Sequence, residues 1–391
     1  MLNPINVSFK NYVSLPSIMA KPLAPKGLQR LEKDVFEHSA VNISFTSVDN
    51  SKVGDAIRAL GDVPCPYCGI KVINGKEFAQ LQKQDYELPA KNVLGSLKKY
   101  EDRMHPVEKQ AFNILESLSE KNPKKTIREL LDTQRDKHLQ NLKSQEYCIF
   151  DELTEYSKTI NNKDDAKAIC NLVEESRQIV NKQDANYIFR RKRLIEKLDI
   201  ITSNMQEKDK AEEISKIADK IPRGHDNIDA FIVKFTQKDT RTKEQKSSKQ
   251  IAMALIEPSV GSLEHIKPRH PQDGSEGGKN TFSNYLYASK EWNTRRKNMP
   301  LDKWVEKNPQ IKENMQKYMD AVIEKINSRK ALSNCRVYPI IAAETVAIES
   351  KGLIKLDVSK LKISDKEKRE GLKEFHKEQK ALAKKHISIA A

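Results

Sequence analysis

The stretch that decides the fold is LEHIKPRHPQDGSEGGKNTFSNYLYASKEWNTRRKN, residues 263–298. It places Glu264 beside His265, continues through Pro268 and the glycines at 274, 277 and 278, and ends in a run of positive charge. Proline and glycine favour turns and loops, so these residues predict an exit from a strand into a loop. We expect a hairpin here, followed by a helix that carries Asn293.

The side chains in this stretch match what hydrolysis of a phosphodiester requires. A histidine has an ordinary pKa of about 6.5, so His265 could deprotonate a water molecule at neutral pH. Mg²⁺ prefers oxygen ligands, which Glu264 and Asn293 could supply. Neighbours on a strand point to opposite sides, so Glu264 and His265 need a strand-to-loop transition to approach one phosphate.

The net charge points to a polyanionic partner. The chain has 391 residues and a formal charge of +15, with 70 Lys and Arg against 55 Asp and Glu. Such an excess favours nucleic acid, because basic side chains replace the counterions of phosphates. DNA is the expected partner, and the composition does not exclude RNA.

The cysteines do not resemble a disulfide framework. There are five, and only Cys65 and Cys68, in CPYCG, are closely spaced. Two cysteines at this spacing leave three interpretations open, which are a zinc knuckle, a redox pair and a buried turn. Cys170 lies in an apolar helical stripe, which predicts a core position.

The chain has no expected membrane segment. Its first residues lack a basic segment followed by a long apolar run, so they do not resemble a signal peptide. No apolar run approaches the roughly 20 residues that span a bilayer. We expect a cytoplasmic protein without a membrane partner.

Most of the chain is predicted to be helical. Residues 1–62 show no clear period, whereas residues 91–250 carry long amphipathic stripes. Pro106 is expected in the first turn of one helix, and Asn122 is expected to cap the next. Helices are also expected over the C-terminal residues 306–391, and Trp292 is expected in the core.

The decisive stretch resembles the HNH endonuclease motif. The resemblance rests on EHIKP (264–268), GGKN (277–280), SNYL (283–286) and WNTRRKN (292–298), in that order. It implies a small ββα-metal fold in which His265 is the general base and Glu264 and Asn293 bind Mg²⁺ or Mn²⁺. It also implies that Asn284 fixes the loop carrying the base by bonding its backbone. The basic residues expected to contact nucleic acid are Lys267, Arg269, Arg295, Arg296 and Lys297.

The resemblance also covers CPYCG. Many HNH proteins bind a structural Zn²⁺ through two CxxC pairs, and Cys65 and Cys68 resemble the first pair. The second pair would fall at Ser289 and Trp292, which are not zinc ligands. The resulting division is an HNH module formed from 63–90 and 251–305, split by a helical insertion over 91–250.

The expected activity is therefore metal-dependent hydrolysis of DNA, as in bacterial or phage defence systems. Two alternatives remain open. The chain could be a catalytically silent nucleic-acid-binding protein that retains an HNH-like fold. It could instead recruit a protein partner through its helical insertion.

Overall fold

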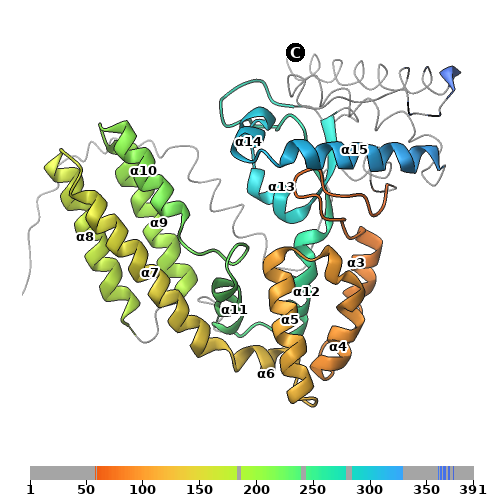
Figure 1. Cartoon of the computed structure of the whole chain (residues 1–391), viewed down its shortest axis with the longest axis horizontal. Coiled ribbons are helices and arrows are strands. Elements are labelled where there is room, and N and C mark those ends of the chain that lie inside the picture. The colour runs from red at the N-terminus through yellow and green to blue at the C-terminus, as the bar shows by residue number, and fades with distance from the viewer. Residues whose placement is uncertain are drawn as a thin grey trace, which may run out of the picture. The chain divides into compact units, whose positions relative to one another are not determined.

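The computed structural model describes residues 60–182, 186–238, 244–278 and 284–328, with a few further positions outside these ranges. These residues form thirteen α-helices and one two-stranded sheet, which confirms the mainly helical prediction (Figure 1). The prediction of an irregular N-terminal segment falls almost entirely outside them. The elements in chain order are α3 (Gly75–Leu81), α4 (Ala90–Leu97), α5 (Pro106–Lys121), α6 (Ile127–Asp132), α7 (Arg135–Ser157), α8 (Lys163–Val180), α9 (Tyr187–Asn204), α10 (Lys208–Asp219), α11 (Ile228–Thr236), α12 (Ser248–Ile256), β1 (Gly261–His265), β2 (Tyr285–Ser289), α13 (Lys290–Arg296), α14 (Leu301–Lys307) and α15 (Ile311–Asn327).

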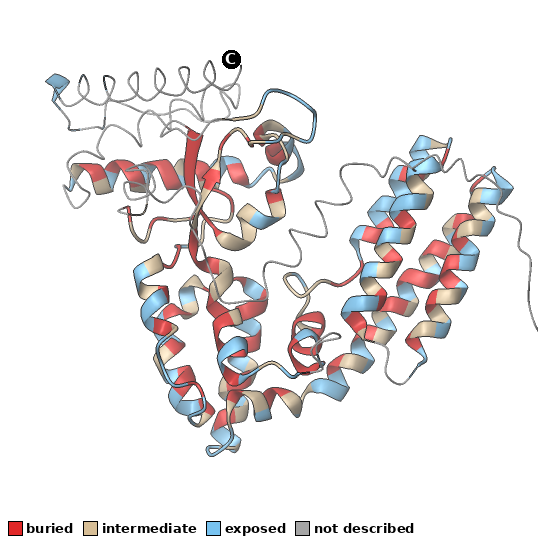
Figure 2. Cartoon of the chain, turned by 180° about the vertical axis from the view of Figure 1, so that it is seen from behind, coloured by how far each residue is buried: buried red, intermediate tan, exposed pale blue. Residues whose placement is uncertain are grey.

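The two strands form the expected hairpin, and α13 follows it directly. β1 and β2 are antiparallel, with Gly261 opposite Ser289 and His265 opposite Tyr285. Every residue of β2 is buried, because both faces of this short sheet are covered (Figure 2). Gly261 is required by close packing, since a Cβ atom there would lie 2.2 Å from the Tyr287 ring.

The CPYCG segment joins this hairpin although almost two hundred residues separate them. Residues 63–72 fold back on themselves, with a bridge between Pro64 and Lys71. Ile73 then pairs with Val260 immediately before β1, and the Ile73 carbonyl accepts the Gly261 N–H at 3.0 Å. The two sequence regions therefore form one structural unit.

The helical region contains two main cores. One unites α4, α5, α6, α11 and α12 with Ile73 and Val260, next to the hairpin. The other lies among α7, α8, α9 and α10, which pack together in Figure 1. The first core therefore crosses the boundary expected near residue 91, and α7–α10 form the part of the helical region with a core of its own.

Individual helix predictions had mixed outcomes. α5 begins at Pro106, as predicted. Asn122 does not cap the next helix but ends α5, and Thr126 caps α6 through a capping box with Glu129. The core prediction for Cys170 was wrong, because this cysteine is exposed on α8. The C-terminal tail helix falls mostly outside the described residues.

No helix within the described ranges combines the length and apolar character needed to cross a membrane.

Candidate active site

His265 stands at the point where β1 ends. Its ring packs on the cross-strand neighbour Tyr285 with a centroid distance of 4.6 Å. The Arg269 Nε–H donates to His265 Nε2 at 3.3 Å, from the loop that leaves the strand. The imidazole is half-buried. His265 is therefore held from two sides at the strand-to-loop transition that the sequence required.

Asn284 ties this loop to the start of β2. Its side-chain oxygen accepts the Lys267 N–H at 2.7 Å, and its side-chain nitrogen donates to the Lys267 carbonyl at 3.0 Å. Asn284 is 6% exposed, so water competes little for these bonds. These are the backbone contacts that the resemblance implied for Asn284, two residues beyond His265.

Gly277 and Gly278 let the end of this loop pack closely against its beginning, residues 267–269. A Cβ atom at Gly278 would lie 1.9 Å from the Lys267 carbonyl oxygen, and one at Gly277 would lie 2.0 Å from the Arg269 carbonyl oxygen. The Gly278 N–H also donates to the Pro268 carbonyl at 2.8 Å. Only glycine fits at these two positions, because the backbone of 267–269 occupies the space of a side chain.

Asn293 lies on α13 and faces β1. Its side-chain nitrogen donates to the Ser262 hydroxyl at 3.0 Å and to the Leu263 carbonyl at 3.1 Å. The amide oxygen, which is the atom that would bind a metal, makes neither contact. α13 therefore packs on the hairpin through Asn293 and leaves this oxygen without a hydrogen bond.

Glu264 and Arg296 form a buried ion pair that the sequence did not predict. Arg296 Nη1 lies 2.6 Å from Glu264 Oε1, and the two side chains are 0% and 5% exposed. Tyr67, from CPYCG, donates to the same carboxylate oxygen at 3.2 Å and accepts from Arg296 at 2.8 Å. Burial raises the pKa of the Glu264 carboxyl to about 7, although the Arg296 guanidinium acts against this rise.

This pair corrects the role expected for Arg296. Its guanidinium also donates to the carbonyls of His265 (2.6 Å), Ile266 (2.5 Å) and Met299 (3.0 Å). A fully buried side chain with these contacts does not face a phosphate. Arg296 instead connects α13 to the backbone that carries His265.

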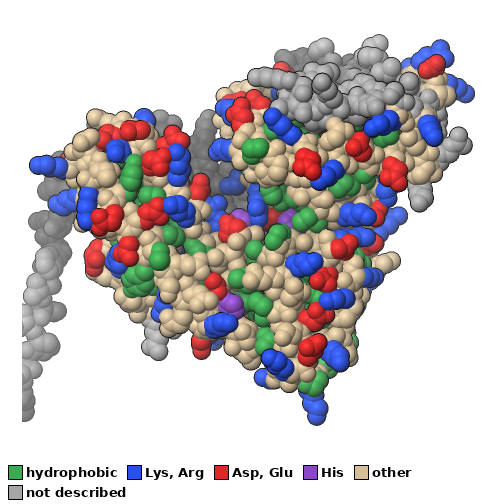
Figure 3. Space-filling view, in the orientation of Figure 1, with side chains coloured by type: hydrophobic (Ala, Val, Ile, Leu, Met, Phe, Trp, Pro, Cys, Tyr) green, Lys and Arg blue, Asp and Glu red, His purple; other side chains and the backbone are tan. Residues whose placement is uncertain are grey.

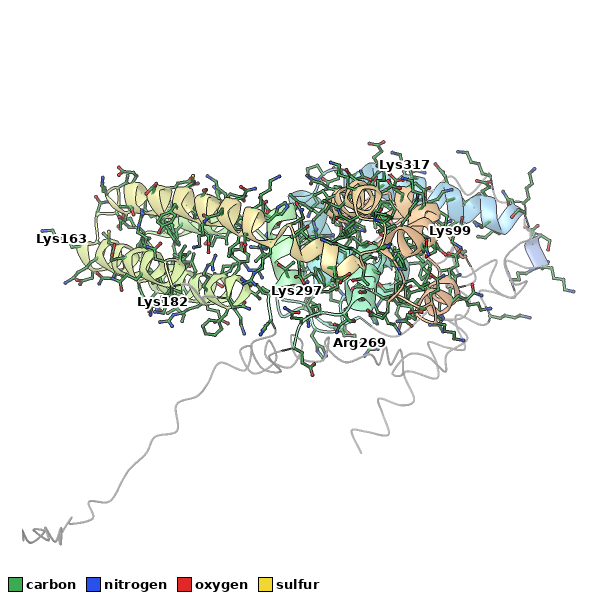
Figure 4. The ribbon with its side chains drawn as sticks, turned by 90° about the horizontal axis from the view of Figure 1, so that it is seen from below. Lys99, Lys163, Lys182, Arg269, Lys297 and Lys317 are labelled. Carbon is green, nitrogen blue, oxygen red and sulfur yellow. The ribbon has the colours of Figure 1, made fainter. Side chains whose placement is uncertain are left out.

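The other predicted nucleic-acid contacts have different surroundings. Arg295 bonds Glu291 at 2.8 Å and the His225 carbonyl at 3.1 Å, and it stacks on Trp292, so it anchors α13 rather than extending into solvent. Lys267 and Arg269 are half-buried on the loop after His265, and Lys297 is exposed. Arg269 and Lys297 lie on the same side of the molecule (Figure 4), where Gln272 bonds Asn298.

Lys297 has an unusual backbone conformation. Its φ is +54° and its ψ is −124°, and it is the single non-glycine residue with positive φ among the described positions. Such a conformation costs an L-residue on the order of 1–3 kcal/mol and is common at functional sites. Sequence reasoning named Lys297 for its charge, but nothing in the sequence indicated this strain.

Cys65 and Cys68 lie against the junction of β2 and α13. Cys65 Sγ accepts the Ser289 N–H at 3.3 Å, and Cys68 Sγ lies 3.9 Å from the Ser289 hydroxyl. Burial alone would raise the pKa of Cys65, but hydrogen bonds from Cys68 and Ser289 outweigh it and lower this pKa to about 6. The pKa of Cys68 is raised, chiefly by its hydrogen bond to Cys65.

This ligand set does not fit a structural zinc. A structural Zn²⁺ takes four ligands, most often Cys and His. Here Ser289 stands at the third position, and Trp292 at the fourth is half-buried against Trp304, with ring centroids 5.8 Å apart. Across the described ranges, no three or more His, Cys, Asp or Glu side chains are grouped to hold a metal ion.

The donors expected for a catalytic cation are chemically suitable. Both hydrogen bonds to the Glu264 carboxylate are accepted by Oε1, so Oε2 accepts none. Asn293 bonds through its side-chain nitrogen, so its Oδ1 atom also accepts no hydrogen bond. One carboxylate and one amide oxygen are sufficient for Mg²⁺, which usually retains several waters and binds substrate phosphate. The ion pair adds one constraint, because Arg296 already neutralises Glu264.

No protein-family model matches the chain, and neither a curated protein nor a solved structure matches it. Function is therefore inferred from the site alone.

Proposed function

We propose that this chain is a metal-dependent endonuclease of the HNH type that hydrolyses DNA phosphodiester bonds. The observation that supports it best is the pair of hydrogen bonds between the Asn284 side chain and the Lys267 backbone, which fixes the loop that follows His265. A general base needs a fixed position relative to the water that it deprotonates. The same unit carries Asn293 on the helix that follows the hairpin.

In this proposal His265 accepts a proton from the attacking water. Its Nε2 atom is bonded by Arg269 in the structure, so Arg269 must turn away before Nε2 can act as a base. A phosphate group would attract the Arg269 guanidinium and so release His265 when substrate arrives. Lys297, exposed on the same side, would hold a neighbouring phosphate.

Glu264 and Asn293 would hold the divalent cation through the oxygens that make no hydrogen bond. When bound, the cation neutralises charge that develops on the leaving oxygen. Arg296 and Tyr67 fix the other carboxylate oxygen and keep Glu264 in place. On the face drawn in Figure 3, Lys and Arg side chains are interspersed with Asp and Glu, so that face is not uniformly basic.

The test is cleavage of supercoiled plasmid by purified protein with Mg²⁺ or Mn²⁺. We expect nicking that EDTA and His265→Ala both abolish, with DNA binding and the unfolding midpoint little changed. His270→Ala is the matched control, because His270 is exposed on the same loop. Equal nicking by His265→Ala and the unchanged protein would refute the proposed base.

A second candidate is a nucleic-acid-binding protein without catalysis. The observation that favours it is the Glu264–Arg296 pair, in which a guanidinium already supplies the positive charge that a metal would supply. This candidate predicts DNA binding that is unaffected by Mg²⁺ or EDTA, and no cleavage under any metal.

A further inference from the structure

The two thiols of CPYCG lie together without the ligands that zinc needs. We propose that Cys65 and Cys68 form a reversible disulfide by exchange with a small disulfide such as oxidised glutathione, and that this disulfide alters the start of α13. Formation of the disulfide is independent of the proposed nuclease activity. Its effect on cleavage rests on that proposed function.

The turn brings the two sulfurs together. The Cys65 N–H donates to the Ile70 carbonyl at 2.8 Å, and the Gly69 N–H donates to the Cys65 carbonyl at 2.9 Å. Gly69 has a φ of +74°, which an L-residue rarely adopts, and this lets the chain reverse directly after Cys68. Both sulfurs also contact the same residue, because Cys65 Sγ accepts the Ser289 N–H at 3.3 Å and Cys68 Sγ lies 3.9 Å from the Ser289 hydroxyl.

The two cysteines differ in their exposure to solvent. Cys65 is 0% exposed, whereas Cys68 is half-buried. An external disulfide can therefore reach Cys68 but not Cys65. Access therefore makes Cys68 the sulfur that meets the external disulfide and Cys65 the enclosed sulfur that resolves the mixed disulfide. Because the thiolate is the attacking form, Cys68 reacts after its proton passes to the neighbouring Cys65 sulfur.

The exchange balances in two steps. The Cys68 sulfur attacks oxidised glutathione, the glutathione S–S bond breaks, and one glutathione leaves while the other remains on Cys68. The Cys65 sulfur then attacks Cys68 Sγ, which forms the protein disulfide and releases the second glutathione. The protein loses two electrons and two protons, and both glutathione molecules leave as thiols.

The disulfide would act on α13 through Ser289. Ser289 is the last residue of β2 and the N-cap of α13, and its N–H donates to Cys65 Sγ. Turning Cys65 Sγ toward Cys68 weakens that bond, because the sulfur gives up its negative charge and its position. α13 carries Asn293, so we expect the oxidised protein to cleave DNA more slowly than the reduced protein.

The first experiment follows the thiols and not cleavage. The test protein is the full chain with Cys148, Cys170 and Cys335 each replaced by serine. It is equilibrated with reduced and oxidised glutathione at several ratios and blocked with iodoacetamide, and its mass is measured by intact-protein mass spectrometry. We expect loss of two hydrogens and no retained glutathione. In this background Cys65→Ser should trap glutathione on Cys68, whereas Cys68→Ser should trap none because Cys65 is enclosed.

Two results would overturn the disulfide. In one, Cys65 and Cys68 stay reduced at glutathione ratios that modify Cys148 in the unchanged chain, where Cys148 is exposed. The other is equal trapping by Cys65→Ser and Cys68→Ser. Circular dichroism of each variant checks that the fold is retained. If a single-cysteine variant misfolds, the three-serine protein, which retains Cys65 and Cys68, still tests the disulfide by its loss of two hydrogens.

A second experiment tests the effect on α13. Hydrogen exchange of residues 290–296 is compared between the reduced and oxidised protein, together with plasmid cleavage. Faster exchange and slower cleavage on oxidation support the coupling, and unchanged exchange refutes it. If neither form cleaves DNA, the proposed nuclease fails, while exchange still decides the coupling.

Discussion

Arg296 Nη1 lies 2.6 Å from Glu264 Oε1, and this ion pair joins the helix after the hairpin to its first strand. Because Tyr67 bonds both partners, the same contact holds CPYCG in place. A buried pair contributes little net stability, but removal of one partner is costly because it leaves a charge without compensation.

We therefore expect Glu264→Ala to lower the free energy of unfolding by about 3–5 kcal/mol, the usual cost of leaving one buried partner uncompensated. Urea unfolding measures this loss. The double variant Glu264→Leu with Arg296→Met should regain only part of it, because the carbonyls of His265, Ile266 and Met299 lose the hydrogen bonds that Arg296 donates. Glu155→Ala is the control, because the Glu155–Lys158 pair is exposed and should contribute less than about 1 kcal/mol. A loss at Glu264 no larger than at Glu155 would contradict the buried pair.

The glycines of the loop provide a second prediction. Gly278→Ala places a methyl group 1.9 Å from the Lys267 carbonyl and 2.5 Å from the Asn284 side chain, so the loop must move. We expect this change to abolish cleavage and to lower the unfolding midpoint. Gly274→Ala is the comparison, because Gly274 has a φ of +73° but no atom within 4 Å of the added carbon. It should cost only about 1 kcal/mol of backbone strain and preserve cleavage.

Lys297 allows charge and strain to be separated. Lys297→Ala removes the charge and retains the strain of the positive φ, whereas Lys297→Gly removes both the charge and the strain. We expect both variants to bind DNA more weakly by a similar factor, with a smaller dependence of affinity on salt. Only the glycine variant should gain stability, by about 1 kcal/mol, because glycine adopts this conformation without strain. Unchanged DNA affinity in both variants would remove Lys297 from the proposed interface.

Much of the hairpin could be predicted from its residues. Pro268 and the glycines marked the exit from β1, and the helix expected to carry Asn293 is α13. The N-cap at Thr126 could also have been predicted, because the residues TIRE (126–129) match a capping box. The prediction chose Asn122 instead because Pro123 follows it. Cys170 followed the buried Ile169 in sequence, and a shift of one residue on a helix turns a side chain to another face.

The ion pair was less accessible to sequence reasoning. In the run Arg295, Arg296, Lys297 the charges are equivalent in sequence, and only the packing of α13 decides which one is enclosed. Helical spacing gave one signal, since Asn293 and Arg296 are three residues apart and therefore share a face. The carboxylate that pairs with Arg296 lies more than thirty residues away, and Tyr67 still further, so the contact depends on the assembled fold.

A last prediction concerns Glu108, which is 3% exposed and has no hydrogen-bond partner on Oε2. Burial raises its pKa from 4.5 to about 7, with Glu291 adding to the rise and Arg295 and Lys234 opposing it. A raised pKa means that the folded state binds the proton more tightly than the unfolded state. The stability from Glu108 is therefore complete below its ordinary pKa and is lost as the pH rises through about 7.

Glu108→Gln should therefore stabilise the protein at pH 8, on the order of 2 kcal/mol, and give a much smaller gain at pH 5. Urea unfolding at both pH values measures the difference in unfolding free energy between the variant and the unchanged protein. His105 lies nearby in both proteins, so its contribution cancels in this difference. Glu120→Gln is the control, because Glu120 is exposed on the same helix and should shift neither curve. A gain at Glu108 that is equal at pH 5 and pH 8 would mean that the change improves packing without removing a buried charge.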